Sequence, residues 1–262
     1  MILLQCISGL LSIAAILYQK RYNRLHHSIY GLSYDLYILD VICHFLSVYC
    51  TINYRWSPLV KSQLSKRFPL FYSMDSSPPI SFALFFKDML LIISCIFILR
   101  QLSVYRSTRH ISQGFSVICM FVLGLSGLFA IFTYVCACSN LPKHDSGKFG
   151  VFYLEHINYL WVISYSLSAF KYMPQLTLNW MGSCTRGLSS KYITINLVAC
   201  LIRLLSSIFP SNKQFYERAY NLCPFVVTLI QFTCLCGIIF QAQWLYMRNR
   251  PYLPKVNSLN GR

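Results

Sequence analysis

Long runs of hydrophobic residues, separated by short polar segments, make up most of the sequence. A helix needs about 20 apolar residues to cross the hydrocarbon core of a bilayer, with some tolerance below that length. Seven runs meet this requirement, and we predict a membrane-spanning helix in each: residues 1–18, 36–52, 80–99, 111–135, 151–170, 192–209 and 222–247. The second and sixth runs also carry polar residues. The pattern predicts an all-α integral membrane protein with seven transmembrane helices.

The composition agrees with an exterior that faces lipid. Of the 262 residues, 56% are hydrophobic and only 11% are charged, whereas a soluble protein has roughly 25% charged residues. The mean hydropathy is +0.50. These values exclude a soluble enzyme, a disordered chain and a nucleic-acid-binding module. Most of the 12 cysteines lie within hydrophobic runs and lack zinc-ligand spacing, so we expect no metal and no other cofactor.

The net charge of +16 comes from Lys and Arg residues that cluster in the loops. If the loops after the first, third and fifth spans share one side with the C-terminal tail, that side carries 12 of these residues and the other side carries 8. Four acidic residues, Asp75, Asp145, Glu155 and Glu217, fall on the side with fewer cations. The positive-inside rule then predicts a lumenal or external N-terminus and a cytosolic tail over residues 248–262.

Two loops match each other when the sequence is shifted by 156 residues. The identities pair Gln19 with Gln175, Asn23 with Asn179, and Gly31-Leu32-Ser33 with Gly187-Leu188-Ser189. Seven residues beyond each serine, Asp40 corresponds to Asn196. Four predicted spans separate the two loops, so both should lie on the same side of the membrane. This indicates two parallel three-helix repeats, which in carriers enclose a substrate site near the midplane.

The repeat defines the expected domain organisation as three helices, one linker helix and three helices. We predict a first bundle over residues 1–99 with its loop at 18–40, a linker helix with flanking loops over 100–150, and a second bundle over 151–247 with its loop at 171–196.

The residues of these loops resemble the PQ-loop family, and within it the cystinosins, which are proton-coupled lysosomal cystine exporters, and their fungal homologues. Lys171-Tyr172-Met173-Pro174-Gln175 followed by Asn179 matches the family pattern Lys-Tyr-x-Pro-Gln-x-x-x-Asn. The first loop has Tyr18-Gln19 in place of Pro-Gln, but its segment 28–35 resembles the Gly-Leu-Ser-aromatic-Asp segment of cystinosins. The segment 243–248 also resembles the end of the last span in fungal members.

Three differences from cystinosins concern the mechanism that the resemblance implies. Asn196 stands where cystinosins have an acid implicated in proton coupling, and Asp40 stands at the symmetry-related position, where an amide is usual. A second family acid aligns with Ser81, while the nearest acid here is Asp88. The large glycosylated lumenal domain of animal cystinosin is absent, as are Asn-x-Ser/Thr sequons.

Two acids within hydrophobic runs are the candidates for proton coupling. An ionised carboxylate in a membrane span costs several kcal/mol unless it is paired or hydrated. Asp40 is the first candidate, because burial should bring its protonation into the range of an acidic lumen. Asp88 is the second. The alternative for Asp40 is a structural hydrogen bond between helices. His44 lies one turn beyond Asp40 on the same helical face. It could share the proton of Asp40, but we favour the alternative of an ordinary packing histidine.

We expect the substrate to contact five polar residues: Gln19, Lys171, Gln175, Asn196 and Arg203. Asn196 can hold a carboxylate or an ammonium without titrating, or it can link two helices. Arg203 lies on the same helical face as Asn196 and could bind a substrate carboxylate, pair with Asp88, or extend to the lumenal surface. For Lys87 we expect extension to that surface.

The second loop should also contain a hinge. Pro174 breaks a helix because it lacks an amide donor and clashes with the preceding turn. Together with Gln175 and Asn179 it forms the predicted hinge, and Asn23 is the counterpart of Asn179 in the first loop. Tyr18 cannot break its helix in this way, so the first half should flex less.

Together these features predict a secondary transporter that exports cystine or a related amino acid, with a proton, from an acidic vacuolar, lysosomal or endosomal compartment to the cytosol. The alternative is a receptor or scaffold of the secretory or endosomal system that kept the same bundle without transport. No nucleophile–base arrangement is visible in the sequence, so we do not expect an enzyme.

Overall fold

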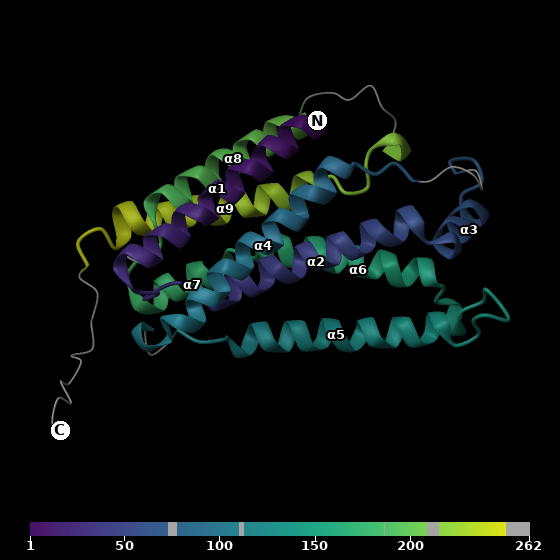
Figure 1. The fold of residues 1–262 in the computed structure, drawn as a ribbon, viewed down its shortest axis with the longest axis horizontal. Helices are drawn as coiled ribbons and strands as arrows, with labels where there is room; N and C mark the ends of the chain where they lie inside the picture. The colour runs from purple at the N-terminus through teal and green to yellow at the C-terminus, as the bar shows by residue number, and fades with distance from the viewer. Residues whose placement is uncertain (73–77, 110–112, 186, 209–214, 250–262) are drawn as a thin grey trace.

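The computed structural model describes residues 1–72, 78–109, 113–185, 187–208 and 215–249. Within these ranges all regular secondary structure is helical (Figure 1). The main elements are α1 (Ile2–His26), α2 (Tyr34–Trp56), α3 (Pro58–Arg67), α4 (Phe82–Val104), α5 (Val117–Cys138), α6 (Tyr153–Phe170), α7 (Met173–Gly182), α8 (Ser190–Ile208) and α9 (Phe225–Phe240), which continues as a π-helical turn over Gln241–Leu245.

Each of the seven predicted hydrophobic runs corresponds to one long helix of the structure. Six of these, α1, α2, α4, α5, α8 and α9, are long and apolar enough to cross a membrane. The seventh, α6, has 18 residues and carries Glu155, His156 and Asn158 in its first turns, which lowers its hydrophobicity. Residues 111–112 and 209 of the predicted spans, and the predicted tail from residue 250 onward, lie outside the described residues.

Two helical segments differ from the expected boundaries. The first predicted span ends at Tyr18, but α1 continues to His26, because Lys20, Arg21 and Arg24 can extend a helix beyond the hydrocarbon core. The short helix α3 was not predicted from the sequence. Its start signal is visible in retrospect, because the Ser57 side chain caps the helix and Pro58 occupies its first turn.

Six helices pack around a common centre. α1 contacts α8 and α4, α2 contacts α4 and α6, and α9 contacts α6 and α8, so that these contacts close a ring. α5 packs against α6 on the outside of this ring (Figure 1). Only 6% of the most hydrophobic window of α5 is buried, and its large side chains are exposed on most sides. Such a surface is stable only against lipid.

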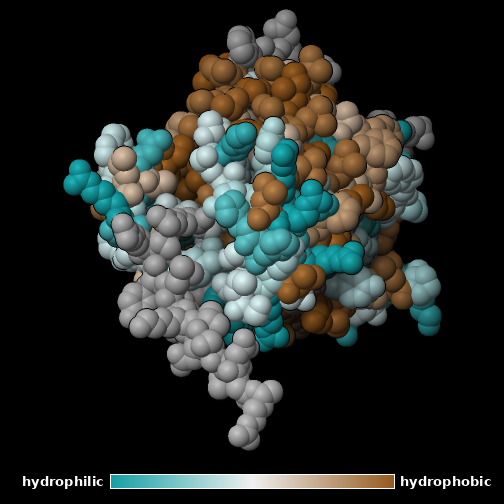
Figure 2. Space-filling model, turned by 60° about the vertical axis from the view of Figure 1, so that its left-hand side comes forward, coloured by the Kyte–Doolittle hydropathy of each residue, from teal (hydrophilic) through white to brown (hydrophobic). Residues whose placement is uncertain are grey.

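The outer surface divides into hydrophobic flanks and a polar end. Figure 2 shows hydrophobic residues on the flanks, whereas hydrophilic residues gather at the end that faces the viewer. The turn between α1 and α2, the short helix α7 and the end of α9 lie at this end of the molecule in Figure 1. The distribution is typical of a protein embedded in a bilayer, with its loops at the aqueous interface.

The turns that precede α2 and α8 touch each other at two glycines. Gly31 has a φ of +75°, which favours glycine. A Cβ atom on Gly187 would lie 2.2 Å from the carbonyl oxygen of Tyr30, so the two backbones approach more closely than any side chain allows. The two matching loops, 156 residues apart in the sequence, therefore meet at the same end of the molecule.

This contact predicts that Gly187→Ala destabilises the fold, whereas Gly182→Ala does not. The added methyl group at Gly187 meets fixed backbone, and such overpacking costs about 1–3 kcal/mol. A Cβ at Gly182 has nothing within 4 Å. Thermal unfolding of the purified protein in lipid nanodiscs measures the difference, and equal melting temperatures for the two variants would contradict the close approach.

Candidate functional site

Gln175, the glutamine of the Pro-Gln motif, connects the second loop to the first. Its side-chain oxygen accepts a hydrogen bond from the amide of Ser33 at 2.8 Å. Its nitrogen donates to the carbonyl of Gly31 at 2.9 Å and to the side chain of Asn179 at 2.8 Å. The side chain is fully buried, and two of its three hydrogen bonds hold the opposite turn.

Gln19 makes the equivalent bonds in the other direction. It accepts from the amide of Ser189 at 2.9 Å, and it donates to the carbonyl of Gly187 at 3.1 Å and to Asn23 at 2.8 Å. Every partner of Gln19 is displaced by 156 residues from a partner of Gln175. The residues that the sequence analysis paired thus form two reciprocal braces. Neither glutamine lines the small polar cavity at the centre of the helix ring. A substrate contact by either of them stays a prediction.

A second pair of glutamines extends each brace to the third helix of its half. Asn23 donates to Gln101 at 3.2 Å, and Asn179 donates to Gln241 at 3.1 Å. Gln101 and Gln241 in turn donate to backbone carbonyls of α1 and α7. The sequence analysis missed both glutamines, although each lies near the polar end of an otherwise hydrophobic helix.

The two loops differ in their backbone. α6 ends at Phe170 and a new helix, α7, begins at Met173 with Pro174 in its first turn, where the missing amide leaves no bond unmade. α1 instead continues through Tyr18 and Gln19 to His26. The structure has the helix break that was predicted at Pro174. It also has an unbroken α1 at Tyr18, as predicted. Whether the break acts as a hinge stays a prediction.

The break places Lys171 beside Asp40. The ammonium of Lys171 donates to Asp40 Oδ1 at 2.6 Å, and both residues are less than 10% exposed. Asp40 Oδ2 accepts from the thiol of Cys95 at 3.2 Å. Lys171 therefore points inward, and the ion pair joins α2 to the end of α6 within the hydrophobic part of the ring.

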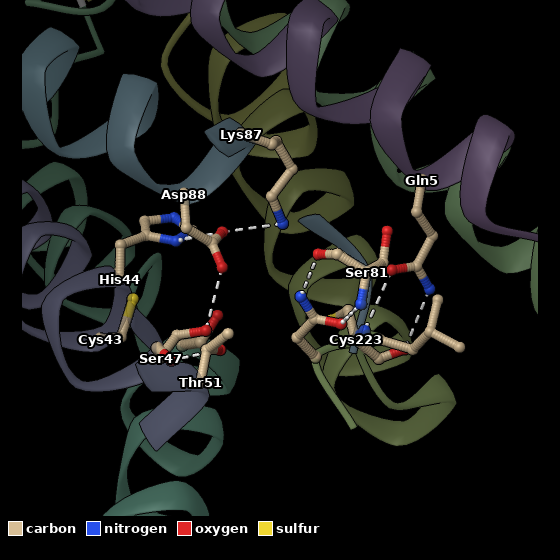
Figure 3. A network of polar contacts seen from close by, with 12 residues as sticks. Gln5, Cys43, His44, Ser47, Thr51, Ser81, Lys87, Asp88 and Cys223 are labelled. Carbon is tan, nitrogen blue, oxygen red and sulfur yellow. Dashed lines mark hydrogen bonds and ion pairs between the residues drawn. The ribbon is translucent and has the colours of Figure 1, made fainter. Parts of the chain in front are cut away.

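Asp88 forms a second buried ion pair, which Figure 3 shows from close by. Its Oδ1 lies 2.8 Å from Lys87 Nζ and 3.0 Å from His44 Nδ1, and its Oδ2 accepts from Ser47 at 2.9 Å. The opposite ring nitrogen of His44 lies 3.4 Å from Asp40 Oδ1. His44 thus bridges the two acids.

Lys87 pairs inward with Asp88, so the expectation that it reaches the membrane surface is wrong. The physical reason is space on α1. A Cβ on Gly9 would lie 2.4 Å from Lys87 Cγ, so the glycine makes room for the stem of the lysine. The hydroxyl of Ser47 donates a hydrogen bond to the other oxygen of the Asp88 carboxylate, Oδ2.

A polar cavity of about 30 Å³ lies at the centre of the ring, beside these pairs. This volume holds one or two water molecules. The ionisable residues that line it are Asp40, His44, Lys87, Lys171, Tyr172, Tyr192, Arg203 and Cys223, and Asn196 lines it as well. The predicted residues Asp40, Lys171, Asn196 and Arg203 therefore converge on one space.

Arg203 has no carboxylate partner among the described residues. One of its terminal nitrogens donates to the sulfur of Cys200 at 3.0 Å, and its buried Nε has no hydrogen-bond partner there. Asp88 is paired with Lys87 and His44 instead, so the Arg203–Asp88 pair considered from the sequence does not form. The Asn196 amide nitrogen donates to the carbonyl of Tyr192 at 3.0 Å.

Buried tyrosines lie at the cavity. Tyr172 and Tyr192 line it, and the ring of Tyr192 lies 6.4 Å from that of Tyr37, which is also buried. Gln5 and Cys223 line the cavity as well, and Gln5 exchanges two hydrogen bonds with the backbone of Cys223, as Figure 3 shows.

Asp40, Cys43 and His44 are the group of described residues whose donor atoms come closest to metal-ligand spacing, within 4.8 Å of one another. In this arrangement the Lys171 ammonium already neutralises Asp40, and Cys43 Sγ donates to the carbonyl of Asp40. The cluster is held by these internal bonds.

A larger groove of about 680 Å³ lies between α5 and the α6–α7 region. Apolar side chains dominate its lining, which includes Pro174 and Phe170. The groove has few polar groups that could select a solute, whereas the small central cavity gathers most of the buried charges. The central cavity is therefore the candidate site.

Comparison with known proteins agrees with this geometry. Residues 157–215 match the family described as PQ loop repeat. The chain is also 52% identical over 257 residues to the uncharacterized protein YCL002C of Saccharomyces cerevisiae, covering 97% of this chain and 98% of that protein. The chain belongs to the PQ-loop family. Membership indicates a multi-pass membrane protein with a transporter-like function.

The buried pair predicts a characteristic double-mutant result. Lys171→Met leaves the Asp40 carboxylate buried without its cation, which costs about 3–5 kcal/mol. Adding Asp40→Asn removes the unpaired charge, so the double variant should recover most of the lost stability. Melting temperatures of the wild type, both single variants and the double variant test this. A double variant as unstable as Lys171→Met would contradict the pairing.

Proposed function

We propose that this protein is a proton-coupled secondary transporter that exports cystine or a related amino acid from an acidic vacuolar, lysosomal or endosomal compartment to the cytosol. The observation that carries the proposal is the ion pair between Asp40 and Lys171, buried beside a polar cavity at the break in α6. Charges in a membrane interior are expensive and mark substrate or ion pathways. The proposal assigns no catalytic chemistry to the chain.

The proposed architecture has seven spans, arranged as two parallel three-helix repeats joined by α5. Reciprocal hydrogen bonds of Gln19 and Gln175 support this arrangement, because equivalent bonds at a shift of 156 residues require equivalent surroundings. The pattern of helix contacts supports it too, since α1 lies against α8 as α6 lies against α2. In parallel-repeat carriers the substrate binds between the two halves.

The charges around the cavity favour a solute with a carboxylate. Lys87, Lys171 and Arg203 supply three cations, and Asp40 and Asp88 supply two carboxylates, which leaves one cation in excess when His44 is neutral. Arg203 lacks a carboxylate partner among the described residues and can bind one bidentately. Asn196 offers an amide oxygen to an ammonium group. Together these groups suit an amino acid.

The coupling follows from the position of Lys171. In an acidic lumen a proton neutralises Asp40, and the attraction that holds Lys171 is lost. Lys171 lies three residues before Pro174, so its release frees the α6–α7 break to change its angle. Release of the proton to the cytosol restores the ion pair and closes the cycle. Movement of the solute is thereby tied to one protonation event.

A receptor or scaffold is the second candidate, and one observation favours it. The cavity holds only one or two water molecules, and the buried side chains of Tyr172 and Tyr192 line it. A carrier must enlarge this space in another conformation, whereas a scaffold need not.

The proposed orientation predicts which loops meet the lumen. The chain contains no glycosylation sequon. An Asn-Gly-Thr acceptor within a flexible insert should be glycosylated in microsomes when placed between α5 and α6, at residues 139–147. The same insert between α7 and α8, near residue 184, should stay unmodified. The reverse pattern would contradict the assignment of the N-terminus to the lumen.

Proton coupling predicts that Asp40→Asn separates proton movement from solute movement. In proteoliposomes that contain a pH-sensitive dye, the ratio of cystine-driven proton flux to cystine exchange should fall about tenfold or more, because the variant lacks the titrating group. Asp35→Asn is the matched control, since Asp35 lies on the same helix and, among the residues that the structure describes, accepts its hydrogen bonds from the Ser116 amide. An unchanged ratio in Asp40→Asn would refute its coupling role.

A further inference from the structure

The two buried ion pairs belong to one continuous chain of ionisable groups. Lys171 contacts Asp40, Asp40 contacts His44, His44 contacts Asp88, and Asp88 contacts Lys87, at distances of 2.6, 3.4, 3.0 and 2.8 Å. From Asp40 to the level of Ser47 the chain covers about 10 Å along α2, at 1.5 Å per residue. His44 is its central member, with one ring nitrogen directed to each acid.

The acids and the histidine of this series of ionisable groups have no equivalents at the repeat-related positions of the second half. At the shift of 156 residues that relates the loops, Asp40 corresponds to Asn196 and His44 corresponds to Cys200. At the shift of 140 residues that relates Gln101 to Gln241, Asp88 corresponds to Thr228. An amide, a thiol and a hydroxyl thus replace two acids and a histidine. A requirement of the fold would be expected in both halves, so we assign a function to these groups, most of which lie in the first half.

Several neighbouring elements place charged or titratable groups around His44. On α1, Gln5, Ser8 and Ser12 face the cavity and do not titrate. The titratable groups at the cavity or against the two acids are Asp40 on α2, Lys87 and Asp88 on α4, Tyr165 on α6, Lys171 and Tyr172 directly after α6, Tyr192 and Arg203 on α8, and Cys223 before α9. Two thiols, Cys43 and Cys95, lie against Asp40. Each acid has a lysine partner and a contact to His44, so His44 is the member placed to pass a proton from one acid to the other.

We infer that His44 is a proton relay that carries protons between Asp88 and Asp40. The inference rests on the proposed proton coupling and deepens it by naming the route. Asp88 and Lys87 lie near the start of α4, toward the end of the ring opposite the braced loops, and there they form the proton entry. The Asp40–Lys171 pair forms the exit at the break in α6.

The transfer balances in a single concerted step. Neutral His44 carries its proton on Nε2, which faces Asp40, while its unprotonated Nδ1 accepts a proton from the carboxylic acid of Asp88. The Nε2 proton passes at the same time to Asp40 Oδ1. Asp88 becomes a carboxylate, Asp40 becomes a carboxylic acid, and His44 is neutral again with its proton on Nδ1. After Asp40 has released its proton toward the cytosol, the imidazole flips to restore the first tautomer.

Gly9 and Ser47 support the entry side of this route. Gly9 leaves space for the stem of Lys87, which holds the ammonium against Asp88 Oδ1. The Ser47 hydroxyl donates to Asp88 Oδ2, and its carbonyl accepts from Thr51 at 2.8 Å. The contacts of Lys87 with Oδ1 and of Ser47 with Oδ2 orient the Asp88 carboxylate toward Nδ1 of His44. A packing histidine would not require this alignment on both sides of its ring.

The test compares His44→Gln with His156→Gln in proteoliposomes, with L-cystine as the probe. Glutamine keeps hydrogen-bonding groups but cannot relay a proton. We expect the ratio of cystine-driven proton flux to cystine exchange to fall about tenfold or more in His44→Gln, because relay by a positioned group contributes at least this much. His156 is also buried, but it contacts Thr133 rather than an acid, so its variant should keep the wild-type ratio. A wild-type ratio in His44→Gln would overturn the relay and leave the proposed function intact.

A second measurement decides the question if the wild-type protein shows no cystine flux. Nitrogen NMR of histidine-labelled protein in lipid nanodiscs reports the tautomer and charge of His44, with its signal assigned by loss in His44→Gln. We expect His44 to change its tautomer or charge on acidification, and Asp88→Asn to displace that transition while Asp35→Asn leaves it in place. A titrating His44 without flux would support the relay against the proposed substrate. A single neutral tautomer at every pH, indifferent to Asp88→Asn, would overturn the relay.

Discussion

The buried ion pair between Lys171 and Asp40 is the constraint on which the structure of the site depends. An unpaired charge at this depth would cost several kcal/mol, so the two residues must stay together whenever Asp40 is ionised. The pair fixes the end of α6 against α2 and thereby sets where the second half of the ring can bend. Lys171 reaches Asp40 because α6 stops at Phe170. The position of the helix break therefore decides where the buried charges lie beside the cavity.

Two layers of polar contacts share the interior of the ring, and they follow different rules. The braces of Gln19 and Gln175 obey the internal repeat, bond for bond. They hold the two glycine turns in contact and give the fold its symmetric frame. The ionisable chain from Lys171 to Lys87 departs from the repeat, because most of its members lie on α2 and α4. Symmetry thus accounts for the scaffold, and the departure from symmetry marks the residues that carry charge.

The sequence predicted the helices well because hydrophobic runs of this length have few other solutions in a membrane. Of the residues that the sequence suggested for substrate or proton binding, Asp40, Lys171, Asn196 and Arg203 line one cavity, whereas Gln19, Gln175 and Asp88 do not line it. The sequence did not predict that His44 would join two acids, or that Lys87 would turn inward. Those outcomes depend on the rotation of α4 against α2 and on the space left by Gly9, and neither can be obtained from the spacing of residues along one helix. The positions of Tyr172 and Tyr192 at the cavity were missed for the same reason.

Infrared difference spectroscopy of the protein in lipid nanodiscs, between neutral and acidic pH, tests the central claim most directly. It detects the carbonyl stretch that a carboxylate gains when it takes up a proton. The account predicts a protonated carboxyl signal that appears on acidification, disappears in Asp40→Asn and persists in Asp35→Asn. An Asp40 that stays ionised throughout this range, paired with Lys171 at every pH, would contradict it.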